Sequence, residues 1–162
     1  MRKRRVILLG ATGSIGASAI KVAESMPDRM EILGMAARCS AQKLAEAANR
    51  SRPEAVCIVD PACLDELRSA LNYSPKILTG DDGLVELATM SGADLVLVAI
   101  VGTAGLRPAL AAIECGKDLA IASKEILVMA GEIVMANARK KNVTILPVDS
   151  EHNAIFQCLE GK

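Results

Sequence analysis

Residues 6–16 read VILLGATGSIG, a short apolar run followed by three glycines at a spacing of three. The apolar run is typical of a buried strand, and residues 17–23 place apolar side chains at the period of a helix. A strand, a glycine turn and a helix in this order are typical of a unit that binds the pyrophosphate of a dinucleotide. In such a unit Gly10 would allow the tight turn, Gly13 would let the backbone approach a phosphate, and Gly16 would let helix and strand pack closely. The first N–H groups of the helix would face the phosphate oxygens.

The glycine spacing is G-x-x-G-x-x-G and not the commoner G-x-G-x-x-G, so the glycines alone leave a purely structural turn open. Thr12 and Ser14 favour a phosphate site, because hydroxyl groups beside free N–H groups suit phosphate oxygens. Either hydroxyl could instead cap the helix. The two roles are compatible, and both stay open.

The composition favours one close-packed α/β domain. The chain has 162 residues, of which 51% are hydrophobic and 1% aromatic, as suits parallel strands that are buried on both faces. The formal net charge is zero, and Tyr73 and Phe156 are the only aromatic residues, so we expect no nucleic-acid partner. We expect the basic run at residues 2–5 to be a solvated lead-in to the first strand.

Cysteines and apolar runs indicate a soluble cytoplasmic protein. The five cysteines include no C-x-x-C pair, which favours a reducing compartment over a disulfide framework or a zinc knuckle. Cys57 lies in an apolar run and is expected in the core. Residues 95–113 are almost wholly apolar, but Gly102, Gly105 and Pro108 interrupt them, so we expect a strand, a loop and a helix there and no membrane span.

Strand and helix patterns alternate along the chain, which predicts a doubly wound, mostly parallel, Rossmann-like sheet. Strands are expected at residues 6–9, 31–36, 55–59, 76–78, 95–101, 118–122 and 143–146, and helices at 17–23, 41–50, 61–71, 81–90, 106–115 and 125–140. Ser40 and Asp60 are expected to cap the helices that follow them.

The end of the second expected strand bears on the choice of nucleotide. NAD-binding units carry an acid about twenty residues after the glycine turn, where it binds the ribose 2′-hydroxyl. Residues 34–40 read GMAARCS, with Arg38 in place of an acid. A guanidinium can bind a 2′-phosphate through two hydrogen bonds, so the sequence favours NADP(H) over NAD(H). Arg38 could instead be an ordinary surface arginine.

A second polar stretch follows the last expected strand, where residues 147–152 read PVDSEH. Open parallel sheets bind ligands at this end of their strands. Asp149 and Glu151 are two residues apart, so an extended loop would put both carboxylates on one side, where they could hold Mg²⁺ or Mn²⁺. The alternative is the cap and charged first turn of a following helix. Lys124, within SKE at residues 123–125, follows another strand and would point into the same crevice. The alternative is again a helix start, with Ser123 as its cap.

Four stretches together resemble one enzyme family. They are GATGSIG at residues 10–16, AIVGTAGL at 99–106, ASKEILV at 122–128 and LPVDSEHNAIFQCL at 146–159. In this order they resemble 1-deoxy-D-xylulose 5-phosphate reductoisomerase of the non-mevalonate isoprenoid pathway. The resemblance implies an enzyme that uses NADPH and Mg²⁺, Mn²⁺ or Co²⁺. It would convert 1-deoxy-D-xylulose 5-phosphate into 2-C-methyl-D-erythritol 4-phosphate, by rearrangement to an aldehyde and reduction by hydride. It also implies a homodimer of the full-length enzyme.

The resemblance assigns roles to individual residues. Together with the glycine turn it places the cofactor at Gly10, Thr12, Gly13, Ser14, Ile15, Ala37, Arg38, Cys39, Ser123 and Glu125. It implies that Lys124 is catalytic and contacts substrate, as do Ser150 and Glu151, and that Asp149 and Glu151 bind the metal; His152 would lie at the edge of this site. Cys39 and Ser123 depart from the family pattern, which usually has an amide side chain at each position.

The resemblance also divides the chain. Residues 1–147 would form the NADPH-binding domain, and residues 148–162 would begin the metal- and substrate-binding catalytic domain. The family's third metal carboxylate, substrate-phosphate pocket and C-terminal helical domain would lie beyond Lys162, so we expect NADPH binding without turnover. We also expect exposed apolar surface at Ile155, Phe156 and Leu159 to favour self-association.

Two other functions stay open. An NADP-dependent semialdehyde dehydrogenase also begins with a GATG turn, but its chemistry needs a nucleophilic cysteine with a base nearby. None of the five cysteines follows an expected strand beside a histidine. A nucleotide-binding module without chemistry would need only the first domain.

Overall fold

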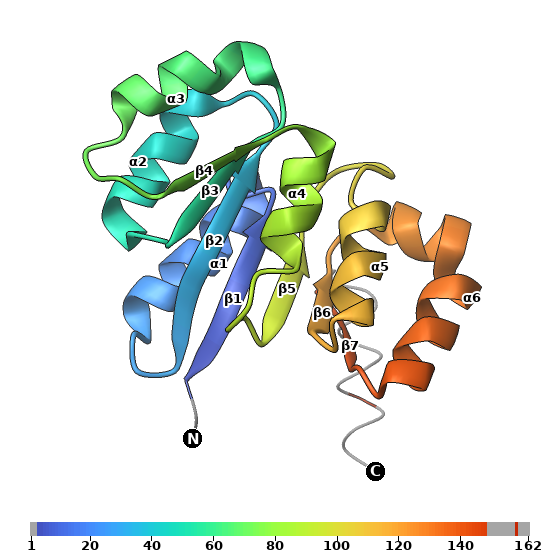
Figure 1. Ribbon diagram of the computed structural model, residues 1–162. Helices are drawn as coiled ribbons and strands as arrows, with labels where there is room; N and C mark the ends of the chain where they lie inside the picture. The colour runs from blue at the N-terminus through green and yellow to red at the C-terminus, as the bar shows by residue number, and fades with distance from the viewer. Residues whose placement is uncertain (1–2, 149–157, 159–162) are drawn as a thin grey trace.

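The chain folds around one parallel β-sheet that carries helices on both faces (Figure 1). The computed structural model describes residues 3–148 and residue 158. Its strands are β1 (Arg4–Leu9), β2 (Met30–Ala37), β3 (Ala55–Ile58), β4 (Lys76–Thr79), β5 (Leu95–Val98), β6 (Asp118–Ile121) and β7 (Ile145–Pro147). Its helices are α1 (Ser14–Ser25), α2 (Ala41–Ser51), the 3-10 helix η1 (Pro61–Cys63), α3 (Leu64–Ala70), α4 (Gly80–Ala88), α5 (Leu106–Glu114) and α6 (Lys124–Lys141).

The strand order is β4-β3-β2-β1-β5-β6-β7, so the chain starts at the centre of the sheet and winds outward in both directions. The order reverses between β1 and β5, and an open α/β sheet leaves a crevice beyond the carboxyl ends of the strands at such a point. Two backbone hydrogen bonds fix this edge: the Gly10 N–H donates to the Ala36 oxygen at 3.0 Å, and the Ala99 N–H donates to the Leu9 oxygen at 2.8 Å.

Alternate side chains of each strand point into two separate hydrophobic cores, one on each face of the sheet. In β1, Ile7 and Leu9 belong to one core, which α4, α5 and α6 cover, and Val6 and Leu8 belong to the other, which α1, α2 and α3 cover. Cys57 in β3 is fully buried, as expected. Because both faces are covered, the strands are apolar at nearly every position, which is the origin of the continuous apolar runs in the sequence. The expected doubly wound α/β fold is confirmed.

The apolar window at residues 95–113 forms β5, a loop and α5, as expected. The strand is shorter than expected: it ends at Val98, and Val101 is 88% exposed. The chain turns away from the sheet in a loop where Gly102 has a φ of +78°. Among the described residues, no helix is both long and apolar enough to cross a membrane.

Two expected helices differ in form, and one of the two expected caps is made. The helix expected over residues 61–71 starts as η1, where the Asp60 carboxylate accepts a hydrogen bond from the Ala62 N–H at 3.0 Å. Ser40 precedes α2, but its side chain makes no capping hydrogen bond. The long helix α6 is interrupted at Ala130, where φ is −135° and ψ is 19°.

In the described part of the basic run, Lys3 and Arg4 are exposed as expected, but β1 already begins at Arg4, so the run is partly within the strand. Arg4 lies 2.9 Å from a carboxylate oxygen of Asp118, and Arg5 lies 2.7 Å from one of Glu54. Arg4 therefore pairs with an acid at the start of β6, two strands away, and Arg5 with one in the loop before β3. Ion pairs this exposed contribute little to stability.

A buried lysine that the sequence did not single out ties the turn before β5 to the start of β6. Lys117 is only 5% exposed, and its ammonium donates hydrogen bonds to the Met90 oxygen at 2.6 Å and the Ala93 oxygen at 3.1 Å. Burial, the largest influence, lowers the pKa of Lys117. The side chain thus satisfies two carbonyl groups that no strand or helix partner reaches.

We expect Lys117→Met to lower the free energy of unfolding by about 2 kcal/mol, because both carbonyl oxygens would lose a charged donor. Urea unfolding followed by circular dichroism measures this change. The control is Lys21→Met at an exposed position of α1, where we expect a change within about 0.5 kcal/mol. Equal, small effects of both substitutions would contradict this role of Lys117.

Candidate functional site

The glycine turn between β1 and α1 is a close contact of backbone with backbone. Gly10 has a φ of +95°, and a Cβ there would lie 2.4 Å from the Ala99 oxygen. A Cβ on Gly16 would lie 2.3 Å from the Gly10 oxygen, whereas one on Gly13 would meet nothing nearer than 3.6 Å. The tight-turn role of Gly10 and the close-packing role of Gly16 are confirmed. The approach of a phosphate to Gly13 stays a prediction.

Helix α1 begins at Ser14, after Gly13 as the N-cap residue. No side chain makes a capping hydrogen bond there, so the alternative that Thr12 or Ser14 caps this helix is wrong. The first N–H groups of a helix have no partner within the helix. They are therefore available to an anion, and the positive end of the helix dipole favours one.

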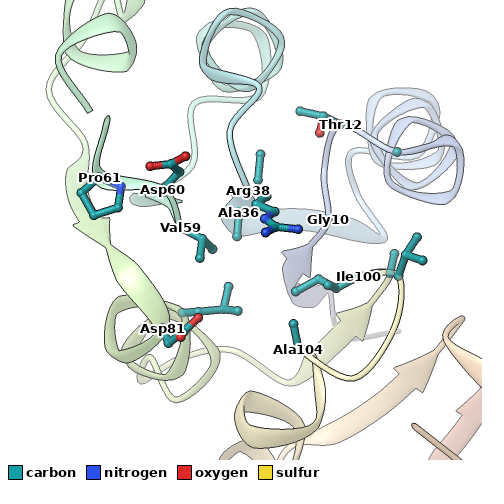
Figure 2. A pocket seen from close by; sticks show the side chains of 15 residues that line it. Gly10, Thr12, Ala36, Arg38, Val59, Asp60, Pro61, Asp81, Ile100 and Ala104 are labelled. Carbon is teal, nitrogen blue, oxygen red and sulfur yellow. The ribbon is translucent and has the colours of Figure 1, made fainter. Parts of the chain in front are cut away.

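A cavity of about 660 Å³ opens at the carboxyl ends of β1, β2, β3 and β5 (Figure 2). Its lining residues are Gly10, Thr12, Gly13, Ala36, Ala37, Arg38, Val59, Asp60, Pro61, Asp81, Leu84, Ala99, Ile100, Val101 and Ala104. This is the edge of the sheet where the strand order reverses, which is where open α/β sheets bind ligands. The volume is in the range of cofactor sites.

Five of the residues expected at the cofactor line this cavity: Gly10, Thr12, Gly13, Ala37 and Arg38. Arg38 is exposed, and its guanidinium makes no hydrogen bond or ion pair with any other residue that the structure describes. The five N–H donors of this positively charged group, just after the end of β2, are thus available to a ligand. The other expected cofactor residues, Ser14, Ile15, Cys39, Ser123 and Glu125, lie outside the lining.

Ser123 makes contacts within the chain that the sequence did not predict, while its expected contact with the cofactor stays a prediction. It is 5% exposed, and its hydroxyl lies 3.0 Å from both the Gly102 oxygen and a carboxylate oxygen of Glu125. Gly102 belongs to the loop that supplies Ile100 and Val101 to the cavity wall. Ser123 therefore joins that loop to the start of α6.

The first turn of α6 carries two exposed charges, Lys124 and Glu125. A hydrogen bond from its own backbone N–H, and then one from the Ser123 hydroxyl, lower the pKa of Glu125. Glu125 is therefore a carboxylate at neutral pH and suits its place at a helix N-terminus. Lys124 lies beside it and does not line the cavity.

Sequence reasoning missed the side of the cavity over β3 and α4, formed by Val59, Asp60, Pro61, Asp81 and Leu84. Asp60 was expected only as a cap. A signal did exist, because Val59 ends one expected strand, Asp60 and Pro61 directly follow it, and Asp81 follows the turn after another. Parallel strands bring such positions to the same edge of the sheet.

The expected metal ligands Asp149 and Glu151, with Ser150 and His152, lie outside the described residues, as do Ile155, Phe156 and Leu159. Of the region expected to begin the catalytic domain, the structure describes only Val148 and Cys158. Within residues 3–148 and 158, no group of three or more histidine, cysteine or acidic side chains could hold a metal ion.

The parallel sheet, the glycine turn and the cavity at the reversal of strand order define a domain of the Rossmann-like α/β class. Within that class, the chain belongs to the 1-deoxy-D-xylulose 5-phosphate reductoisomerase family, whose family model matches residues 6–131. The resemblance seen in the sequence is confirmed. The family assignment leaves the semialdehyde dehydrogenase interpretation without support.

Full-length relatives of this family are closely similar to the chain. It is 48% identical over 159 residues to the reductoisomerase of Exiguobacterium sibiricum, a match that covers 98% of this chain and 41% of the relative. It is 48% identical over 161 residues to that of a Synechococcus species, covering 98% and 40%. The chain thus spans about 40% of the length of the curated relatives that it matches.

Solved structures of this family are also similar to the chain. The Zymomonas mobilis reductoisomerase in complex with NADPH superposes with a TM-score of 0.91 at 46% identity, over 96% of this chain and 41% of that one. A reductoisomerase in complex with NADPH, fosmidomycin and magnesium gives 0.88 at 41% identity, over 96% and 38%. A Synechocystis biliverdin reductase, at 20% identity and a TM-score of 0.64, shares the fold alone.

We expect Gly16→Ala to lower the free energy of unfolding by about 3 kcal/mol. Its Cβ would clash with the Gly10 oxygen, a backbone atom that can move only if the turn itself shifts. Gly13→Ala, in the same turn, should stay within about 1 kcal/mol, because its surroundings are open and its φ is negative. Thermal unfolding of both variants compares them. Equal destabilisation by the two substitutions would show that the contact at Gly16 is not what makes this turn sensitive to an added side chain.

Proposed function

We propose that this chain binds NADPH in the cavity at the carboxyl ends of β1, β2, β3 and β5. The observation that carries the proposal is that one cavity joins an open glycine turn at Gly13 to a free guanidinium at Arg38. The first offers backbone N–H groups to a pyrophosphate, and the second offers a charged fork to a 2′-phosphate. NADPH carries both groups.

The pyrophosphate half of the site is the turn from Gly10 into α1. Thr12, Gly13, Ser14 and Ile15 would hold the phosphates through N–H groups and hydroxyls at the positive end of the helix dipole. The absence of a side chain at Gly13 lets the backbone itself approach the phosphate oxygens, which shortens those hydrogen bonds.

The 2′-phosphate half follows β2. Arg38 would bind this phosphate, flanked by Ala37 and by the exposed thiol of Cys39. No acid stands where NAD-binding units hold the ribose hydroxyls, so the same position does not repel the extra phosphate. Ser123 and Glu125 would support the nicotinamide end, because the Ser123 hydroxyl holds the loop that contains Ile100 and Val101.

In a polypeptide of the relatives' length, we propose that this domain serves the conversion of 1-deoxy-D-xylulose 5-phosphate into 2-C-methyl-D-erythritol 4-phosphate. The cofactor held by these residues would supply the hydride for the reductive step. Lys124 would contact the substrate, where an ammonium stabilises negative charge that develops on an oxygen. Ser150 and Glu151 would contact the same phosphorylated sugar, and Asp149 and Glu151 would ligate Mg²⁺, Mn²⁺ or Co²⁺ through carboxylate oxygens.

We further propose a homodimer in the full-length form and a cytoplasmic location. Helix α6 supports the first, because Val128, Met129 and Ile133 are 84%, 67% and 57% exposed and such side chains suit a covered surface. The second is supported by the cysteines, since the described ones are all free thiols.

We expect NADPH, but not NADH, to raise the melting temperature. At a ligand concentration one hundred times Kd, the stabilisation is about 2.7 kcal/mol, or roughly 5–10 °C for a chain of this size. Arg38→Glu should abolish the difference between the two cofactors, because a carboxylate repels the 2′-phosphate. Thermal shift with both nucleotides measures this effect, and Arg139→Glu, at the far end of α6, is the charge-matched control. An equal response of the wild-type chain to both nucleotides would sink the assignment of Arg38.

We expect Gly13→Ala to weaken NADPH binding about tenfold while it leaves the fold intact, because its Cβ would hold the phosphate away from the backbone N–H groups. Isothermal titration calorimetry measures the affinity. Unchanged affinity would mean that the phosphates do not approach the turn at Gly13.

A further inference from the structure

Two thiols lie beside the cavity, in the segments that follow two neighbouring strands. Cys39 follows β2 and comes directly after Arg38, and Cys63 ends η1, which follows β3. Both are free, and Cys39 is exposed whereas Cys63 is partly buried. The cavity wall includes Arg38 from the first segment, and Asp60 and Pro61 from the second. A covalent bond between the two thiols would therefore act directly on this wall.

Backbone hydrogen bonds bring the two segments together. The Asp60 N–H donates to the Arg38 oxygen at 2.8 Å, just beyond the last paired residues of β2 and β3. Because the strands are parallel and in register, this bond brings Cys39 beside Asp60. The Cys63 N–H donates to the Asp60 oxygen at 3.1 Å, which folds Cys63 back toward the same residue. Asp60 thus links the two cysteines.

The helices that follow the two cysteines lie side by side over one core. Asn49 of α2 donates a hydrogen bond to the Ala70 oxygen of α3 at 3.0 Å, and Figure 1 shows the two helices next to each other. Both helices connect parallel strands on one face of the sheet, so they run in the same direction. Their N-terminal ends are therefore neighbours as well. Cys39 lies one residue before the N-cap of α2, and Cys63 is the N-cap of α3.

The ionisation of Cys63 is consistent with this arrangement. Burial is the largest influence that raises the pKa of Cys63, and the negative charges of Asp60 and of the Cys39 thiolate raise it further. Coulomb interactions near a protein surface are largely screened beyond about 10 Å, so the sulfur of Cys39 lies near that of Cys63. Cys63 is therefore a thiol at neutral pH, and Cys39 is the member of the pair that solvent reaches.

We propose that Cys39 and Cys63 form a disulfide when the chain meets an oxidising low-molecular-weight disulfide, and that this bond lowers the affinity of the cavity for NADPH. The disulfide is independent of the proposed function, whereas its effect on NADPH rests on that function. The bond would make the cofactor site sensitive to the redox state of its surroundings.

The reaction proceeds by two thiol–disulfide exchanges, with oxidised glutathione as the oxidant. The exposed Cys39 thiolate attacks one sulfur of glutathione disulfide, forms a mixed disulfide and releases one glutathione thiolate. Cys63 then loses its proton to solvent, attacks the Cys39 sulfur and releases the second glutathione thiolate. Two protein thiols are thereby oxidised to one disulfide, and one glutathione disulfide is reduced to two thiols.

The position of Arg38 explains the effect on the cofactor. A disulfide requires its two Cα atoms to lie about 4.4–6.8 Å apart, with the side chains directed toward each other. The exposed Cys39 must therefore turn toward the partly buried Cys63, and the backbone of the adjacent Arg38 moves with it. In the proposed site Arg38 holds the 2′-phosphate, so its displacement removes hydrogen bonds between charged groups.

Peptide mass spectrometry tests for the disulfide after this chain is incubated with oxidised glutathione and its remaining thiols are alkylated. We expect a bond between Cys39 and Cys63 that dithiothreitol removes. Cys63→Ser should stop at the mixed disulfide of Cys39 with glutathione, because the second attack is lost. Cys115→Ser, which removes another exposed thiol, should form the bond as the wild-type chain does. Two free thiols, a stable glutathione adduct on wild-type Cys39, or a disulfide between two chains would each overturn the proposal.

Isothermal titration calorimetry with NADPH, before and after oxidation, tests the consequence. We expect the oxidised wild-type chain to bind about tenfold more weakly, as for a lost hydrogen bond to a charged group. In Cys39→Ser the ratio of the two affinities should be about one. A disulfide that leaves the wild-type affinity unchanged would overturn the effect on the cofactor alone. If the reduced chain binds no NADPH, the proposed cofactor site is wrong, while the mass spectrum still decides whether the disulfide forms.

Discussion

The contact on which the rest of this structure depends is the passage of α1 across the end of β1. A side chain at Gly16 would lie 2.3 Å from the Gly10 oxygen, and one at Gly10 would lie 2.4 Å from the Ala99 oxygen. Three segments, the ends of β1 and β5 and the start of α1, therefore meet with backbone against backbone. Gly13, the N-cap residue of α1, lies in the lining of the cavity beside this contact.

The order of the strands in the sheet then determines which segments form the rest of the cavity. Because the order reverses at β1, the ends of β2 and β3 lie on one side of the turn and the loop after β5 on the other. The residues that line the cavity thus come from the turn before α1, from the end of β2 at Arg38 and from α4 at Asp81. In the proposed NADPH site, the pyrophosphate would lie at the glycine turn and the 2′-phosphate at Arg38. Each contact is modest by itself, so their order along one cavity is what would give selectivity.

Much of this could be predicted from the sequence, because local patterns carry it. Periodicity gave the alternation of strands and helices, and the glycine spacing gave the turn. The position of Arg38 relative to that turn gave the expected cofactor. The features that could not be predicted depend on contacts between residues that are distant in the sequence. No local pattern predicts the hydrogen bond from Ser123 to the Gly102 oxygen or the hydrogen bonds from Lys117 to two carbonyl groups of a distant turn. Nor does a local pattern predict that Asp81 lines the cavity. The strand expected to reach Val101 ended at Val98, because an apolar run does not mark where hydrogen bonding stops.

The most direct test of the central claim is a titration of the ¹⁵N-labelled chain with NADPH, followed by two-dimensional NMR of the backbone amides. The account predicts that the largest shifts fall at Gly10, Thr12, Gly13 and Arg38, at the carboxyl ends of β1 and β2. Thr144, at the opposite edge of the sheet beside the start of β6, should stay unchanged. Shifts that avoid the glycine turn, or none at saturating NADPH, would contradict the account.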